Sequence, residues 1–182
     1  MKDLLRSNVE SGGNNPGIEV DRMFNAIKII DTVHSEIHEG EHWTLVDSDE
    51  KNALQYKYYS FVAPSAEYAH FVCEVGLSNT GVVGFYEGST LTATGTAITP
   101  NNNDRNNITS TTGMLCYEDV GPSVAGTLLN YFVIGSSSPS AKIGGITGTR
   151  NEWILKKGTR YLLIILVDNN NTKIALDATW YE

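Results

Sequence analysis

Short stretches of alternating apolar and polar residues, separated by turns rich in glycine and asparagine, run through this 182-residue chain from residue 41 onward. In residues 68–75, for example, Ala69, Phe71 and Val75 fall on one face of an extended strand. Short strands in close succession predict an all-β fold, an antiparallel sandwich or a barrel, rather than an α/β fold. We expect strands at residues 55–63, 68–75, 82–87, 91–94, 108–111, 114–117, 127–134, 152–155, 160–168 and 172–181.

The last two of these strands have the clearest local pattern. Residues 160–168 are apolar on both faces, which is typical of a strand at the centre of a sheet. An asparagine-rich turn follows, and residues 172–181 then alternate between apolar and polar side chains. We therefore expect the two strands to pair as an antiparallel hairpin that closes the chain.

The beginning of the chain has a different composition. Residues 11–17 are a run of turn-forming residues with nothing to bury, so we expect residues 1–24 to form a flexible N-terminal arm. Residues 25–182 would then form one β-sandwich domain. Residues 20–33 stay open between two interpretations. Their apolar spacing fits one face of a helix, whereas their β-branched residues favour a strand.

Two loops are polar over their whole length. Residues 99–107 are rich in asparagine, and residues 135–140 are mostly serine. Neither contains a side chain that would gain from burial, so we expect both to lie on the surface.

The charge and composition exclude several classes of protein. The net charge of −8 disfavours nucleic acid as the main partner, because phosphate binding needs clustered lysine and arginine. No apolar run reaches the ~20 residues that span a bilayer, and residues 1–8 lack the apolar stretch of a signal peptide. We therefore expect a protein that folds in a cytosol, with Cys73 and Cys116 as buried free thiols.

Three of the four histidines recur every four residues, at His34, His38 and His42, with glutamates between them. On a helix, His34 and His38 would share a face and could ligate a metal ion. The order is not that of a metalloprotease, in which glutamate follows the first histidine directly. Solvated or hydrogen-bonded side chains are therefore the favoured interpretation, and a metal site is the alternative.

No motif in the sequence supplies a catalytic set. His70 lies alone on its predicted strand, and a general base also needs a nucleophile and an orienting group. A nucleophile elbow of the Gly-x-Ser-x-Gly type is absent. Aromatic residues cluster at 56–61 and could stack on sugar rings, but packing in a β-sandwich core is their more common use. We therefore expect a protein without enzymatic activity, and without catalytic, cofactor-binding or metal-binding residues.

Several segments together resemble virion structural proteins of tailed bacteriophages. The resemblance spans about residues 25–182 and is carried by the blocks Asn25–Asp31, His34–His42, Tyr68–Phe71, Asn103–Asn106, Lys142–Gly145, Glu152–Lys156 and Ala178–Glu182. Such proteins are commonly regarded as head decoration (cement) proteins. Their pattern carries no catalytic motif that could be transferred to this chain.

The resemblance implies a jelly-roll β-sandwich that forms homotrimers at threefold or quasi-threefold points on the capsid exterior. Such a protein would be made in the bacterial host cytoplasm and would stabilise the shell by bridging subunits of the major capsid protein. Its acidic charge would keep it soluble before it meets the shell. Related phage β-proteins also occur on tails and baseplates, so a glycan-binding, receptor-recognition module is the alternative.

Overall fold

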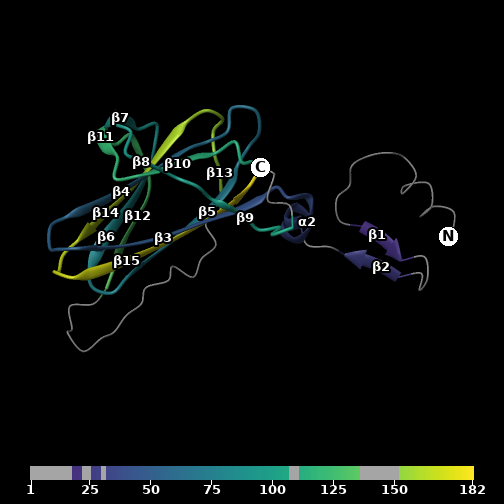
Figure 1. Ribbon diagram of the computed structural model, residues 1–182, viewed down its shortest axis with the longest axis horizontal. Coiled ribbons are helices and arrows are strands. Elements are labelled where there is room, and N and C mark those ends of the chain that lie inside the picture. Colours follow the sequence, from purple (N-terminus) through teal and green to yellow (C-terminus); the bar gives the residue numbers. More distant parts are fainter. Residues whose placement is uncertain (1–17, 22–25, 30–31, 107–110, 136–151) are drawn as a thin grey trace.

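Two antiparallel β-sheets pack face to face in a computed structural model, which describes residues 18–21, 26–29, 32–106, 111–135 and 152–182 (Figure 1). The five-stranded sheet contains, in spatial order, β13 (Trp153–Ile154), β5 (His70–Leu77), β15 (Thr172–Tyr181), β3 (His42–Lys51) and β9 (Asn101–Asn102). The six-stranded sheet contains β12 (Thr127–Ile134), β6 (Gly81–Glu87), β14 (Arg160–Val167), β4 (Tyr56–Val62), β10 (Leu115–Glu118) and β8 (Thr96–Ile98). The predicted all-β sandwich is confirmed.

Consecutive long strands change sheets. The chain runs from β3 to β4, β5 and β6 and later from β12 to β13, β14 and β15. Each of these strands lies in the sheet opposite the preceding one, except that β12 lies in the same sheet as β6. The inward side chains of both sheets form one core, whose aromatic members include Phe61, Phe71, Phe85 and Trp180. The rings of Phe61 and Phe71 lie 4.9 Å apart between centroids and join the two sheets at the centre of the sandwich.

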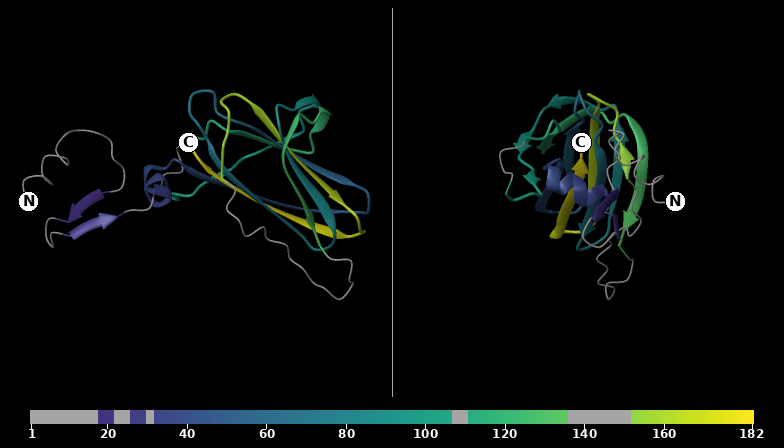
Figure 2. Two further views of the ribbon diagram at one scale, coloured as in Figure 1. Left: turned by 180° about the vertical axis from the view of Figure 1, so that it is seen from behind. Right: turned by 90° about the vertical axis from the view of Figure 1, so that its right-hand side faces the viewer.

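Between β6 and β12 the chain forms an insertion that lengthens both sheets on the same side. Its strand β9 pairs with β3, and its strands β10 and β8 continue the other sheet beyond β4. The rest of the insertion includes a small antiparallel pair, β7 (Thr90–Ala93) and β11 (Gly121–Val124), which lies at the end of the sandwich away from helix α2 (Thr32–Glu39; Figures 1 and 2). The insertion therefore covers two residues of the β3 edge and four residues of the β4 edge.

The expected closing hairpin is wrong. Strand β14 is central, as its apolar faces predicted, but it pairs with β4 and β6, whereas β15 pairs with β3 and β5 in the opposite sheet. The turn after Val167 therefore crosses between sheets. Asn171 adopts a positive φ of 54° in this turn, a conformation that asparagine tolerates.

The open question of residues 20–33 is answered for the described part of that segment. Ile18–Asp21 (β1) and Ala26–Ile29 (β2) pair as antiparallel strands, and helix α2 begins at Thr32. The expected domain boundary between residues 24 and 25 falls between these two paired strands. Residues 1–17, most of the loop at 135–140 and most of the predicted strand at 108–111 lie outside the described residues.

The polar loop at 99–107 is not exposed throughout, contrary to expectation. Asn102 is buried, and its side-chain amide donates a hydrogen bond to the backbone carbonyl of Gly40 at 2.6 Å. Its carbonyl oxygen accepts from the backbone N–H of Asp104. A buried amide is stable here because both ends of its side chain are hydrogen-bonded.

Candidate interaction surfaces

The outer face of the six-stranded sheet is covered by apolar and aromatic side chains. The strand registers place residues in rows that cross the sheet from β12 to β4 and beyond. Three such rows are Val133–Val82–Leu166–Tyr56, Tyr131–Gly84–Ile164–Tyr58 and Leu128–Tyr86–Leu162–Ser60–Tyr117. We call this surface the apolar face.

Five of the ten large hydrophobic side chains that are exposed in the described structure lie on the apolar face: Tyr56, Leu115, Leu128, Tyr131 and Val133. Arg160 is the only charged residue among the described strand residues on this face. Its guanidinium donates to Ser60 Oγ at 2.9 Å and lies over the ring of Tyr117. The charge is therefore held against the sheet, and the apolar face lacks the charged residues that normally cover a solvated sheet.

The outer face of the five-stranded sheet is polar by comparison. Its rows include Val46–Asp177–Glu74, Ser48–Ala175–Gly76 and the pair Glu50–Lys173. Val46, at 66% exposed, lies beside Asp177. Of the two outer faces, only that of the six-stranded sheet combines exposed aromatic residues with a near absence of charge, which is typical of a contact surface.

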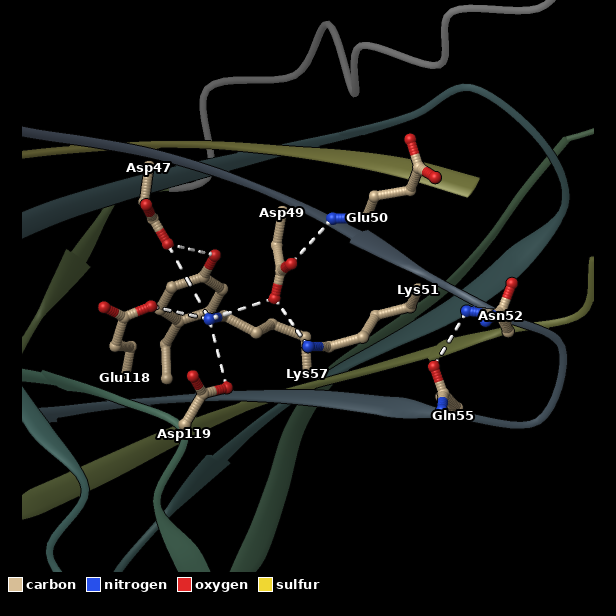
Figure 3. Close-up of polar contacts among 10 residues, drawn as sticks. Asp47, Asp49, Glu50, Lys51, Asn52, Gln55, Lys57, Glu118 and Asp119 are labelled. Carbon is tan, nitrogen blue, oxygen red and sulfur yellow. Dashed lines mark hydrogen bonds and ion pairs between the residues drawn. The ribbon is translucent and has the colours of Figure 1, made fainter. Parts of the chain in front are cut away.

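A buried lysine joins the two sheets near the β3–β4 turn (Figure 3). Lys57 on β4 is 2% exposed, and its Nζ lies 2.6 Å from Glu118 Oε2, 3.1 Å from Asp119 Oδ1 and 3.2 Å from Asp49 Oδ2. Asp47 lies 4.0 Å from the same nitrogen and accepts a 2.7 Å hydrogen bond from the hydroxyl of Tyr59. We call these residues the Lys57 cluster.

The contacts within the Lys57 cluster favour the charged forms of Lys57 and Asp49. Burial by itself would lower the pKa of Lys57, but hydrogen bonds to Glu118, Asp119 and Asp49 outweigh burial and raise it. Burial opposes ionisation of Asp49 as well, yet contacts with Lys51, the backbone N–H of Glu50 and Lys57 hold its pKa below the ordinary value. The cluster is therefore a charged clamp between β3, β4 and the end of β10.

The acidic run at residues 47–50 lacks the fixed spacing of a calcium loop, and the lysine that these acids surround was not predicted from the sequence. One signal was present. Lys57 occupies the same face of its predicted strand as Tyr59 and Phe61, both of which the structure buries. A lysine at an inward position needs several carboxylates nearby.

The histidines of the periodic run lie on different elements. His34 and His38 belong to α2, and the side chain of His34 is outside the described part of the structure, whereas His38 is exposed. His42 begins β3, is buried, and lies 2.6 Å from the side-chain amide of Asn103 through Nδ1. Burial lowers the pKa of His42.

His70 takes part in a ring stack that the sequence did not reveal. The register aligns His42, Tyr181 and His70 in one row, and the rings of Tyr181 and His70 stack at 4.5 Å. Glu152 Oε1 lies 2.8 Å from His70 Nδ1 and accepts a 2.9 Å hydrogen bond from the hydroxyl of Tyr181. These contacts give His70 a structural position beside β13.

The three glutamates of the same run do come together. One carboxylate oxygen from each of Glu36, Glu39 and Glu41 lies within 4.8 Å of the others, a spacing that could hold a metal ion. Burial, followed by the charges of Glu41 and Glu39, raises the pKa of Glu36. Exposed carboxylates of this kind are also common without an ion, and the cluster has no second feature that indicates a ligand.

A cleft of about 320 Å³ lies near the end of the chain, between the start of β3 and the loop after β4. Its lining includes the acidic residues Glu41, Glu67 and Glu182. Glu182 accepts a hydrogen bond from the backbone N–H of Gly113 at 2.6 Å through one oxygen. Its other oxygen and Trp43 Nε1 are buried and have no hydrogen-bond partner within the described part of the chain.

Comparisons with known proteins add no relative. No protein-family model, no curated protein and no solved structure matches this chain. Across the residues that the structure describes, no helix has the length and apolarity needed to cross a membrane.

Proposed function

We propose that this protein acts by adhesion, as a decoration protein on the exterior of a bacteriophage head. In this role it forms a homotrimer and stabilises the shell by bridging subunits of the major capsid protein. The observation that carries the proposal is the apolar face: a broad, nearly uncharged sheet surface on a rigid sandwich suits protein–protein contact.

The strand order supports the jelly-roll part of the proposal. Without the strands of the insertion, the spatial order of the strands is β3–β15–β5–β13 in one sheet and β4–β14–β6–β12 in the other. Two four-stranded sheets with chain crossings between them are the arrangement of a jelly roll, in which two Greek keys interlock. The resemblance to virion structural proteins points to the same architecture.

The surface charge fits a protein that must stay soluble until it assembles. The chain carries a net charge of −8, and on the five-stranded sheet the outward side chains include Glu50, Glu74 and Asp177. Weak contacts would be sufficient on a shell, because a trimer that touches several subunits gains through effective concentration.

The test is to add purified protein to phage heads that lack a decoration protein. We expect saturable binding in particle sedimentation and a higher melting temperature of the heads, measured by scanning calorimetry. Absence of binding at near-physiological salt would contradict the proposal. Val133→Asp on the apolar face should weaken this binding, and Val46→Asp on the outer face of the five-stranded sheet is the control for the added charge alone.

A second candidate function is recognition of a host glycan by a tail or baseplate protein. The rings of Tyr56 and Tyr58 stack at 5.6 Å on the apolar face, and exposed aromatic rings of this kind can pack against sugars. A glycan array distinguishes the two functions: specific binding that is lost in Tyr56→Ala supports recognition of a glycan, whereas binding to heads supports decoration.

A further inference from the structure

We infer that the apolar face, together with the edge of β12, is covered by another copy of this chain. The inference rests on the proposed adhesive function and names the partner that occupies this face. It places the polar face of the five-stranded sheet away from the contact, where it meets solvent or the shell.

The backbone of β12 offers an open edge on which a neighbouring chain can pair. In the two large sheets β12 is the longest terminal strand, with eight residues, whereas the terminal strands β8, β9 and β13 have two or three. Because β9 and β13 pair over only two residues each, β3 and β5 also keep open edges, but those edges border the polar outer face of the five-stranded sheet. The backbone N–H and C=O groups of β12 on the side away from β6 can hydrogen-bond to a strand of a neighbour. Exposed Tyr131 and Val133 on the same strand make this edge continuous with the apolar face.

The distribution of charge favours this face for a contact between two copies. Two molecules that each carry a charge of −8 repel one another when their acidic surfaces meet. The apolar face has no acidic side chain among its described strand residues, and its one cation, Arg160, is tied to Ser60. It is therefore the surface where two such chains can approach with the least electrostatic cost.

The size of the face fits this role. The four strands β12, β6, β14 and β4 have seven or eight residues each. With about 4.8 Å between strands and about 3.3 Å per residue, they form a patch of about 500 Å² before the relief of the side chains is counted. A standard interface buries about 800 Å² per partner, so the face and the β12 edge together are of the right order.

The experiment compares two valines of nearly equal exposure. Val133 on the apolar face is 67% exposed and Val46 on the polar face is 66% exposed. We would measure the mass of the wild type, Val133→Asp and Val46→Asp by light scattering at micromolar concentration, with circular dichroism as the check of folding. Tyr131→Ser is a second variant on the apolar face that adds no charge.

We expect wild type and Val46→Asp to have a mass near three times 19.9 kDa. For Val133→Asp, the protein concentration at which the assembly dissociates should be at least about tenfold higher than for the wild type. Tyr131→Ser should weaken the assembly in the same direction. A monomeric wild type, or an oligomer that Val133→Asp and Tyr131→Ser leave intact, overturns the inference. If the wild type is a monomer that binds heads through this face, the shell occupies it instead, and the decoration proposal survives without its homotrimer. If the protein self-associates through this face but ignores heads, the decoration proposal fails alone.

Discussion

Replacing Lys57 by methionine tests whether the Lys57 cluster stabilises the sandwich. Methionine keeps the length and the apolar stem of the side chain but removes the charge. Breaking a buried ion pair by removing one partner costs about 3–5 kcal/mol. The side chains of the partner carboxylates are 24–56% exposed, so water replaces part of the lost interaction. We therefore expect a loss near the lower limit, about 3 kcal/mol.

Urea unfolding gives the free energy directly, and a thermal melt should show a decrease of about 6–12 °C for a chain of this length. Lys173→Met is the matched control, because Lys173 is an exposed lysine that faces Glu50 across strands β15 and β3. Removing an exposed pair should cost less than about 0.5 kcal/mol. A loss below about 1 kcal/mol in Lys57→Met would refute the reasoning.

The difference in stability between wild type and Lys57→Met depends on pH in a defined way. The pKa of Lys57 is raised, so its contribution to the free energy of unfolding is complete below 10.5, the ordinary pKa of a lysine. The pKa of Asp49 is lowered, so its contribution is complete above the ordinary value of 3.8 and is lost as the pH falls through the lower folded value. The difference between wild type and Lys57→Met should therefore be constant near neutral pH and shrink below about pH 3.8.

Three further predictions concern other parts of the fold. Glu36→Gln should raise the melting temperature at pH 7 but not below pH 4.5, the ordinary pKa of a glutamate. The pKa of Glu36 is raised in the folded protein, so its ionisation opposes folding only at higher pH; equal gains at both pH values would contradict this. Cys116 is buried as expected, whereas Cys73 is only partly buried. Desolvation raises the pKa of both thiols to about 12, so a disulfide reagent at pH 8 should label the native protein far more slowly than the urea-unfolded protein. Gly88 and Gly95 both have a φ of +76°, but only at Gly95 would a Cβ collide with the backbone of β10. In urea unfolding, Gly88→Ala should cost about 1–2 kcal/mol and Gly95→Ala clearly more; equal losses would show that the collision is relieved.

Patterns within one strand predicted most of the fold. The apolar run at 160–168 became the central strand β14, which has a neighbour on both sides, faces the core with one set of side chains and contributes the other set to the apolar face. The pairing of the last two strands could not be predicted in the same way. A short asparagine turn can join neighbours in one sheet or cross to the opposite sheet, and the alternation in residues 172–181 is the same in both cases.

The features that sequence reasoning missed depend on partners far away in the chain. Lys57 finds Glu118 sixty-one residues later, and Asn102 finds the carbonyl of Gly40 sixty-two residues earlier. Neither local composition nor spacing encodes such contacts. The apolar face likewise appears only after the registers align side chains from separate strands, since each strand by itself shows only a few outward apolar residues.

The insertion between β6 and β12 has a consequence for uncontrolled polymerisation. Edge-to-edge fibres grow only when each molecule offers two complementary open strands, one to receive a neighbour and one to extend the row. Here β10 and β8 extend the six-stranded sheet beyond β4, and β9 pairs with the first two residues of β3. Among the strands that the structure describes, the open edges that remain are β12 and the parts of β3 and β5 that their two-residue neighbours leave uncovered. The insertion therefore removes part of the edges through which a row of molecules could grow, and an edge-to-edge fibre would have to join β12 of one molecule to a shorter open edge of the next.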